Sequence, residues 1–297
     1  MTHTLIEVLA PLALAAVGLA YARRCLTLSR RGQPVAGWRQ ACFGTGLLIV
    51  LLADLPPLAE LAEELIVAHM AQHLLIGDIA ALLIVLGLTG PLLQPILRRP
   101  ALRWLRVLGH PVVALPLWLV NLYLWHLGAL YQGVLESPAL HLAQHVGFCF
   151  FGVVMWMPLL GPLPKPAWFG NGAKLIYLLA VRFAGAALAN VLAWAGSPLY
   201  PDYAEGEAEW DITPLADQGS AGILMMTESG LLTFGLFAWL FLQWANQDSE
   251  RQDLLDLADR RGVELDPRRA ARAVAAGRGG ELAERIVREG SASPRPG

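Results

Sequence analysis

The sequence predicts an all-α, polytopic membrane protein, because the chain is unusually apolar and its charged residues are segregated. Of the 297 residues, 56% are hydrophobic and only 15% are charged, and the mean hydropathy is +0.49. Soluble domains usually carry about 25% charged residues. Nearly uncharged stretches of roughly 20 residues recur along the chain, and each is long enough to cross a bilayer core of about 30 Å.

Seven such stretches are expected to be transmembrane helices. They cover residues 4–22, 40–55, 64–89, 111–130, 139–160, 173–195 and 220–244. The first stretch could instead be a cleaved signal peptide, but no positive charge precedes its apolar run, and Arg23 and Arg24 follow it directly. We therefore expect a retained helix and a seven-helix transmembrane domain over residues 1–245.

The short connections between these stretches alternate in charge, and this alternation predicts their orientation. Lys and Arg occur after the first, third and fifth stretches, as Arg23, Arg24, Arg30, Arg31, Arg39, Arg98, Arg99, Arg103, Arg106, Lys165 and Lys174. The other three connections contain no Lys or Arg. Since positively charged short loops remain in the cytoplasm, we expect the N-terminus outside and the C-terminus inside.

The composition changes after residue 245 to a charged segment with ten acidic and ten basic residues. Apolar residues recur there at helical spacing, as Leu254, Leu255, Leu257, Ala258, Leu282, Ile286 and Val287. We expect residues 246–297 to form a cytoplasmic helical tail, with a hairpin around 261–269 and a disordered end over 291–297.

Two short segments share the pentad His-x-Ala-Gln-His inside apolar stretches. "AHMAQHLL" contains His69 and His73, and "LHLAQHVG" contains His141 and His145. A four-residue step places two side chains on one helical face, with Cβ atoms about 5–6 Å apart. Both helices are expected to run from outside to inside, so all four imidazoles lie in the outer half of the membrane. His126, at the end of the antiparallel helix, reaches the same level.

This arrangement predicts a metal site near the extracytoplasmic face, although other roles are open. Buried histidines also serve as interhelical hydrogen-bond donors, or as parts of a proton relay. Haem is disfavoured by the spacing, because a bis-histidine haem takes one ligand from each of two helices and leaves the second histidine of each pair idle.

Copper is the expected ion, as Cu(I) or Cu(II), and zinc is less favoured. Neutral imidazole suits both metals, and sulfur ligands shift the preference towards Cu(I). Sulfur is available from Cys149, one turn after His145, and from Met70, Met225 and Met226. Each sulfur side chain could equally fill the apolar core.

Three charged residues fall near the middle of predicted helices: Asp78, Arg182 and Glu228. An isolated charge at that depth costs several kcal/mol. We expect Arg182 to pair with Asp78 or Glu228, and a proton or ion path is the alternative.

The pentads belong to a longer set of linked motifs that resembles a known family. The segment "AHMAQHLL", the segment "NLYLWHLGALYQGVLESPALHLAQHVGFCFFGVVMWMPLLGP" and the segment "DQGSAGILMM" resemble the CtaG-type cytochrome c oxidase assembly factors. The matching positions are His69, His73, Trp125, His126, Tyr131, His141, His145, Asp217, Gly222 and Met225. Of these, Asp217 is expected to orient a ligand rather than to bind the ion.

The resemblance implies a non-enzymatic, copper-binding assembly factor in the plasma membrane of a bacterium. Its expected partners are cytochrome c oxidase subunits, other copper chaperones and the lipid bilayer, with no nucleic acid. The acidic loop from Asp202 to Asp217 could raise the local copper concentration. The alternatives are a membrane haem or metal oxidoreductase, a copper transporter, and a scaffold that binds no metal.

Overall fold

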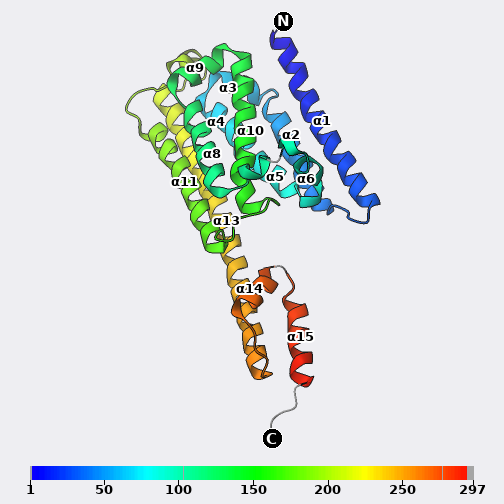
Figure 1. Cartoon of the computed structure of the whole chain (residues 1–297). Coiled ribbons are helices and arrows are strands. Elements are labelled where there is room, and N and C mark those ends of the chain that lie inside the picture. The colour runs from blue at the N-terminus through cyan, green and yellow to red at the C-terminus, as the bar shows by residue number, and fades with distance from the viewer. Residues whose placement is uncertain (1, 103, 276, 293–297) are drawn as a thin grey trace. The chain divides into compact units, whose positions relative to one another are not determined.

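The structure is a computed structural model that describes residues 2–102, 104–275 and 277–292. Within these ranges the chain forms helices, turns and loops and contains no β-strand (Figure 1). It divides into two compact units, residues 1–233 and 234–297. The all-α prediction is therefore confirmed.

The helices of the first unit cover the predicted stretches, but the stretch 64–89 is divided into three helical elements and the stretch 111–130 is interrupted after Trp125. They are α1 (Thr2–Arg30), α2 (Gly37–Ala53), α3 (Leu58–Glu64), α4 (Ile66–Leu74), the π-helix η1 (Leu75–Ala80), α5 (Ala81–Gly87), α6 (Gly90–Leu97), the 3-10 helix η2 (Pro100–Leu102), α7 (Leu105–Leu108), α8 (Pro111–Trp125), α9 (Gly128–Glu136), α10 (Pro138–Leu160), α11 (Asn171–Trp194), the 3-10 helix η3 (Pro201–Tyr203) and α12 (Ala204–Glu209). The helix α13 (Pro214–Arg260) is continuous across the division between the two units.

Within the described ranges, five helical segments are long and apolar enough to cross a membrane: Leu9–Arg30, Ile66–Gly87, Pro138–Leu160, Asn171–Trp194 and Pro214–Arg260. Two further candidates are bent. The pair α2 and α3 bends by 49°, and the pair Pro100–Leu108 and Pro111–Trp125 bends by 80°. The described residues thus contain five candidate spans, or up to seven if each bent pair is one span. A multi-pass membrane protein follows from either number.

Helix α10 packs against α5, η1 and α8 in the first unit (Figure 1). Small residues allow these helices to approach one another closely. A Cβ atom on Gly152 of α10 would collide with the carbonyl oxygen of Gly77 in η1, and one on Gly87 would lie 2.6 Å from the Cβ of Phe43 in α2. Such contacts bring helix backbones together in membranes, and here they bring the segment that follows His73 against α10.

The buried arginine of α11 pairs with the carboxylate of the π-helix. Arg182 donates to both carboxylate oxygens of Asp78, with N–O distances of 3.3 Å and 3.3 Å, and its guanidinium lies 4.9 Å from the ring centroid of Trp156. The predicted pairing of Arg182 is confirmed, with Asp78 as its partner. The buried carboxylate oxygens of Glu228 have no hydrogen-bond partner among the described residues.

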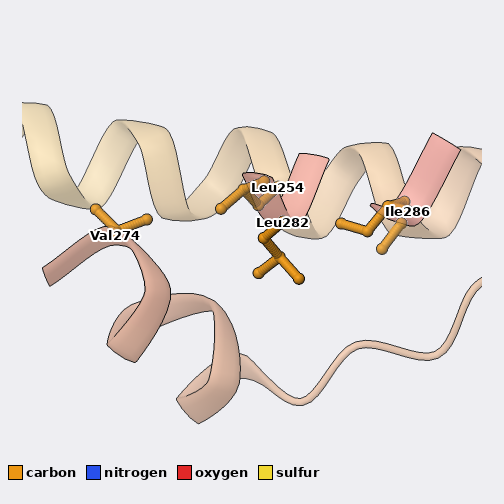
Figure 2. Close-up of a cluster of buried hydrophobic side chains, with 5 residues drawn as sticks. Leu254, Val274, Leu282 and Ile286 are labelled. Atoms are coloured by element: carbon orange, nitrogen blue, oxygen red, sulfur yellow. The ribbon is translucent and has the colours of Figure 1, made fainter. Parts of the chain in front are cut away.

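The second unit comprises the C-terminal part of α13 with α14 (Pro267–Ala275) and α15 (Gly279–Ala292). Figure 2 shows Leu254, Val274, Leu282 and Ile286, which form a small apolar core together with Ala258. The helical spacing of the tail predicted four of these five positions. The turn expected around 261–269 separates α13 from α14. Helix α15 extends through Ala292, and residues 293–297 lie outside the described residues.

Candidate metal centre

Four imidazole rings from the two pentads lie next to one another. The centroids of the His69 and His73 rings in α4 are 4.3 Å apart, and those of His141 and His145 in α10 are 4.2 Å apart. Across the two helices, His69 is 5.6 Å from His141 and His73 is 5.5 Å from His145. Each helix thus supplies one edge of a four-sided group, which we call the histidine cluster (His69, His73, His141 and His145).

The histidine cluster lies inside the protein. His69, His73 and His145 are only 1%, 5% and 6% exposed, and His141 is half-buried. A buried polar group costs free energy unless it finds a partner, so the hydrogen bonds of each ring nitrogen indicate what the ring can do.

The Nδ1 atoms of two cluster rings are held by groups from other elements. Nδ1 of His145 donates to the Asp54 carboxylate, at 2.8 Å. Nδ1 of His69 lies 2.9 Å from the hydroxyl of Tyr203 and 3.2 Å from the carbonyl oxygen of Ala62. Metal-binding histidines commonly use one nitrogen in this way, which fixes the orientation of the ring and leaves the other nitrogen as the donor to the ion.

His73 and His126 follow the same pattern. Nε2 of His73 lies 3.1 Å from the side-chain oxygen of Gln144, and Nδ1 of His126 donates to the carbonyl oxygen of Leu122 at 2.7 Å. Gln144 is the glutamine of the second pentad and is fully buried. The pentad therefore supplies both the rings and one of the groups that orient them.

In each of the four cluster rings and in His126, one ring nitrogen has no hydrogen-bond partner among the described residues. These nitrogens are Nε2 of His69, Nδ1 of His73, Nε2 of His126, Nε2 of His141 and Nε2 of His145. Leaving one such buried atom unsatisfied costs about 1–3 kcal/mol. Four of these atoms belong to the histidine cluster and the fifth to the neighbouring His126, and together they form a set of nitrogen donors suited to a bound cation.

His126 lies beside the cluster rather than within it. Its ring centroid is 6.2 Å from those of Tyr131 and Phe148. These two aromatic rings contact the cluster directly, since Tyr131 is 5.0 Å from His69 and Phe148 is 4.4 Å from His73. Tyr131 and Phe148 thus contact both His126 and the cluster.

Asp217 acts on the helix that carries the first pentad. Its carboxylate oxygens accept hydrogen bonds from the backbone N–H groups of Ile66 and Val67, at 2.6 and 3.0 Å. These N–H groups belong to the first turn of α4, where a helix has unsatisfied donors and favours negative charge. Asp217 makes no hydrogen bond to a histidine among the described residues. It positions α4, and with it His69 and His73.

Two of the four sulfur candidates, Met225 and Cys149, are not joined to the cluster by any hydrogen bond in the described part of the chain. Met225 is buried in α13, and Cys149 is half-buried in α10. The structure groups four imidazoles and leaves both sulfur atoms outside their hydrogen-bond network.

Sequence reasoning missed three groups that contact the cluster: Asp54, Gln144 and Tyr203. The two glutamines of the pentads carried a usable signal, because a repeated polar residue inside an apolar helix is costly. A lone aspartate at the end of an apolar stretch, as in Asp54, was a weaker signal. Nothing in the local sequence links Tyr203 to His69, which lies 134 residues away.

The donor set fits an imidazole-bound ion, although the rings do not yet converge on one point. Histidine nitrogens bind zinc, for example, at about 2.0–2.1 Å. Among the described residues, no three His, Cys, Asp or Glu side chains are arranged as a metal site.

These features define a class: a multi-pass helical membrane protein with a buried cluster of oriented imidazoles. The chain belongs to the family of cytochrome c oxidase caa3 assembly factors (Caa3_CtaG), whose model matches residues 19–247. The resemblance expected from the linked motifs is thereby confirmed, and the family is one of assembly factors for an oxidase.

Two mycobacterial proteins are similar to this chain. They are the uncharacterized protein Mb0105 of Mycobacterium bovis and the uncharacterized protein MT0111 of Mycobacterium tuberculosis, each 24% identical over 254 residues. The match covers 78% of this chain and 38% of each relative, so the chain spans well under half the length of these proteins. No solved structure matches the chain.

Proposed function

We propose that this protein binds copper as cargo at the histidine cluster and assists the metallation of a haem-copper cytochrome c oxidase. The observation that carries the proposal is the set of partner-free ring nitrogens around the cluster, most of them opposite a nitrogen that already has a partner. Family membership supports the role in oxidase assembly, and the nitrogen donor atoms support the binding of a metal ion at the cluster.

His69, His73, His141 and His145 are the proposed ligands. His126 is a fifth candidate, because its Nε2 also has no partner among the described residues and its ring neighbours Tyr131 and Phe148, which contact the cluster. Imidazole suits both copper and zinc, and the oxidase family favours copper. Copper bound in this way is held by neutral, oriented rings, and no chemical step by this chain is required.

The proposed topology is seven spans with the N-terminus outside and the C-terminus inside a bacterial plasma membrane. The distribution of Lys and Arg supports this orientation. In this orientation the cluster would lie near the extracytoplasmic face, where an oxidase subunit or another copper chaperone could exchange copper with the cluster. A cytoplasmic reporter fused within residues 196–219 should be inactive, and activity there would reverse the topology.

The test is to replace each histidine pair separately in cells that require the protein for oxidase assembly. His69→Ala/His73→Ala and His141→Ala/His145→Ala should each abolish copper-loaded oxidase, measured by copper content and haem spectra of the membranes. His110→Ala is the matched control, because His110 lies at the opposite end of α8 from His126, 6.0 Å from Trp168 between ring centroids.

Both pair variants must still reach the membrane at normal levels for the comparison to count. His69→Gln/His73→Gln serves as a second variant, since glutamine keeps a polar group at each position. Normal oxidase in cells that carry either pair variant would contradict the proposal.

A further inference from the structure

A cavity of about 520 Å³ lies between α1, α2, α3 and α10 and reaches the histidine cluster. His141 and His145 line it, and so does Gln72 of the first pentad. Three carboxylates also line it: Asp54, Glu60 and Glu63. Among the described residues that line it, none is Lys, Arg, Cys or Met.

Two buried side chains in this lining have polar atoms without a partner among the described residues. His145 is 6% exposed and its Nε2 is unpaired; Gln72 is 1% exposed and its Oε1 is unpaired. The amide nitrogen of Gln72 donates to the carbonyl oxygen of Ala53 at 2.7 Å, which fixes the side chain. Both partner-free atoms are themselves buried, and they belong to side chains that line the cavity.

The carboxylates of Glu60 and Glu63 are exposed, whereas that of Asp54 is about one-third exposed and bonded to His145. Negative charge therefore extends from the solvent to the Asp54 carboxylate, which touches a cluster ring. The remaining lining is mostly apolar, and low-dielectric walls focus the field of such charges on an approaching cation.

We propose that this cavity is the entrance through which copper reaches the histidine cluster, and that copper enters as the divalent ion. This rests on the proposed function of the cluster. Carboxylate oxygens and imidazoles suit Cu(II), while thiol and thioether ligands select Cu(I). In the part of the chain that the structure describes, the cavity lining offers the first set of donors and not the second.

The experiment measures how fast Cu(II) binds to the purified full chain in detergent at low ionic strength. Glu60→Gln/Glu63→Gln should slow association by about tenfold and remove most of its salt dependence, because electrostatic steering acts on the association rate. The amount of copper bound at equilibrium should not change, since neither glutamate contacts a cluster ring.

The matched control is Glu205→Gln/Glu209→Gln, which removes the same charge from exposed positions of the acidic loop that do not line the cavity. Its association rate should equal that of the wild type. Helicity and elution volume check that both double variants are folded, and exposed glutamates are expected to tolerate the change.

The possible results of this experiment test the entrance cavity and the proposed copper binding separately. If the control variant binds copper more slowly than the wild type and the cavity variant does not, the acidic loop attracts the ion. The proposal that the cavity is the entrance is then wrong, although the cluster still binds copper. If the wild type binds only Cu(I), supplied with a reductant, the divalent entrance is overturned and the proposed function stands. If the wild type binds copper in neither state, both proposals fall.

Discussion

The hydrogen bond between Asp54 and His145 is the most informative single contact to perturb. Asp54→Asn keeps the shape and an acceptor oxygen but removes the negative charge that faces Nδ1 of His145 at 2.8 Å. Without that charge the imidazole is a weaker donor through Nε2. Replacing such a partner of a metal-binding histidine typically weakens metal affinity about 10–100-fold.

The lower end of that range is expected here, because 34% of the Asp54 side chain is exposed and solvent screens its charge. We predict about tenfold weaker Cu(II) binding, which corresponds to about 1.4 kcal/mol. The assay is equilibrium competition against a copper chelator with the purified full chain. Asp202→Asn, which removes a carboxylate from an exposed position outside the cavity, should leave the affinity unchanged. An affinity for Asp54→Asn equal to that of the wild type would refute the role given to this contact.

Three further predictions concern groups around the cluster and within the membrane. Asp217→Asn should lower the free energy of unfolding by about 1–2 kcal/mol through the weakened cap on α4, measured by denaturant titration, and an unchanged midpoint would exclude the capping role. Arg182→Leu should lower the free energy of unfolding by about 3–5 kcal/mol because it leaves Asp78 unpaired. Adding Asp78→Leu should restore part of that free energy, and strict additivity of the two changes would contradict the pairing. Burial, with the nearby Asp217 carboxylate, raises the pKa of Glu207 above its ordinary value of 4.5. The folded state therefore holds this proton more tightly than the unfolded state, and the free energy of unfolding declines as the pH rises through the raised pKa. Glu207→Gln should therefore melt higher than the wild type at pH 8, with a difference that closes by about pH 4, and a pH-independent difference would rule out this titration.

The sequence was sufficient for the parts of the fold that depend on local pattern. The apolar stretches predicted the long helices, and the four-residue spacing predicted that His69 and His73 share a face. The same spacing in α10, at matched depth, predicted that the two pairs meet. Each conclusion needs only helical periodicity and the cost of burying an imidazole.

The orienting groups could not be predicted, because tertiary packing selects them. Asp54 and His145 are 91 residues apart, and Asp217 caps a helix that begins 151 residues earlier in the chain. The sequence of the π-helix Leu75–Ala80 carries no local signal that distinguishes it from an α-helix. The role expected for Asp217, orientation of a ligand ring, is replaced in the structure by orientation of the whole helix α4.

The copper content of the purified protein tests the central claim most directly. The full chain, exposed to Cu(II) and freed of excess metal, should retain copper by mass spectrometric metal analysis, with X-ray absorption dominated by imidazole nitrogen. The variant in which His69, His73, His141 and His145 are all alanine should retain none, while His110→Ala retains the wild-type amount. Copper retained by the four-histidine variant at the wild-type level would contradict the account, and the cluster would then be a set of interhelical polar contacts.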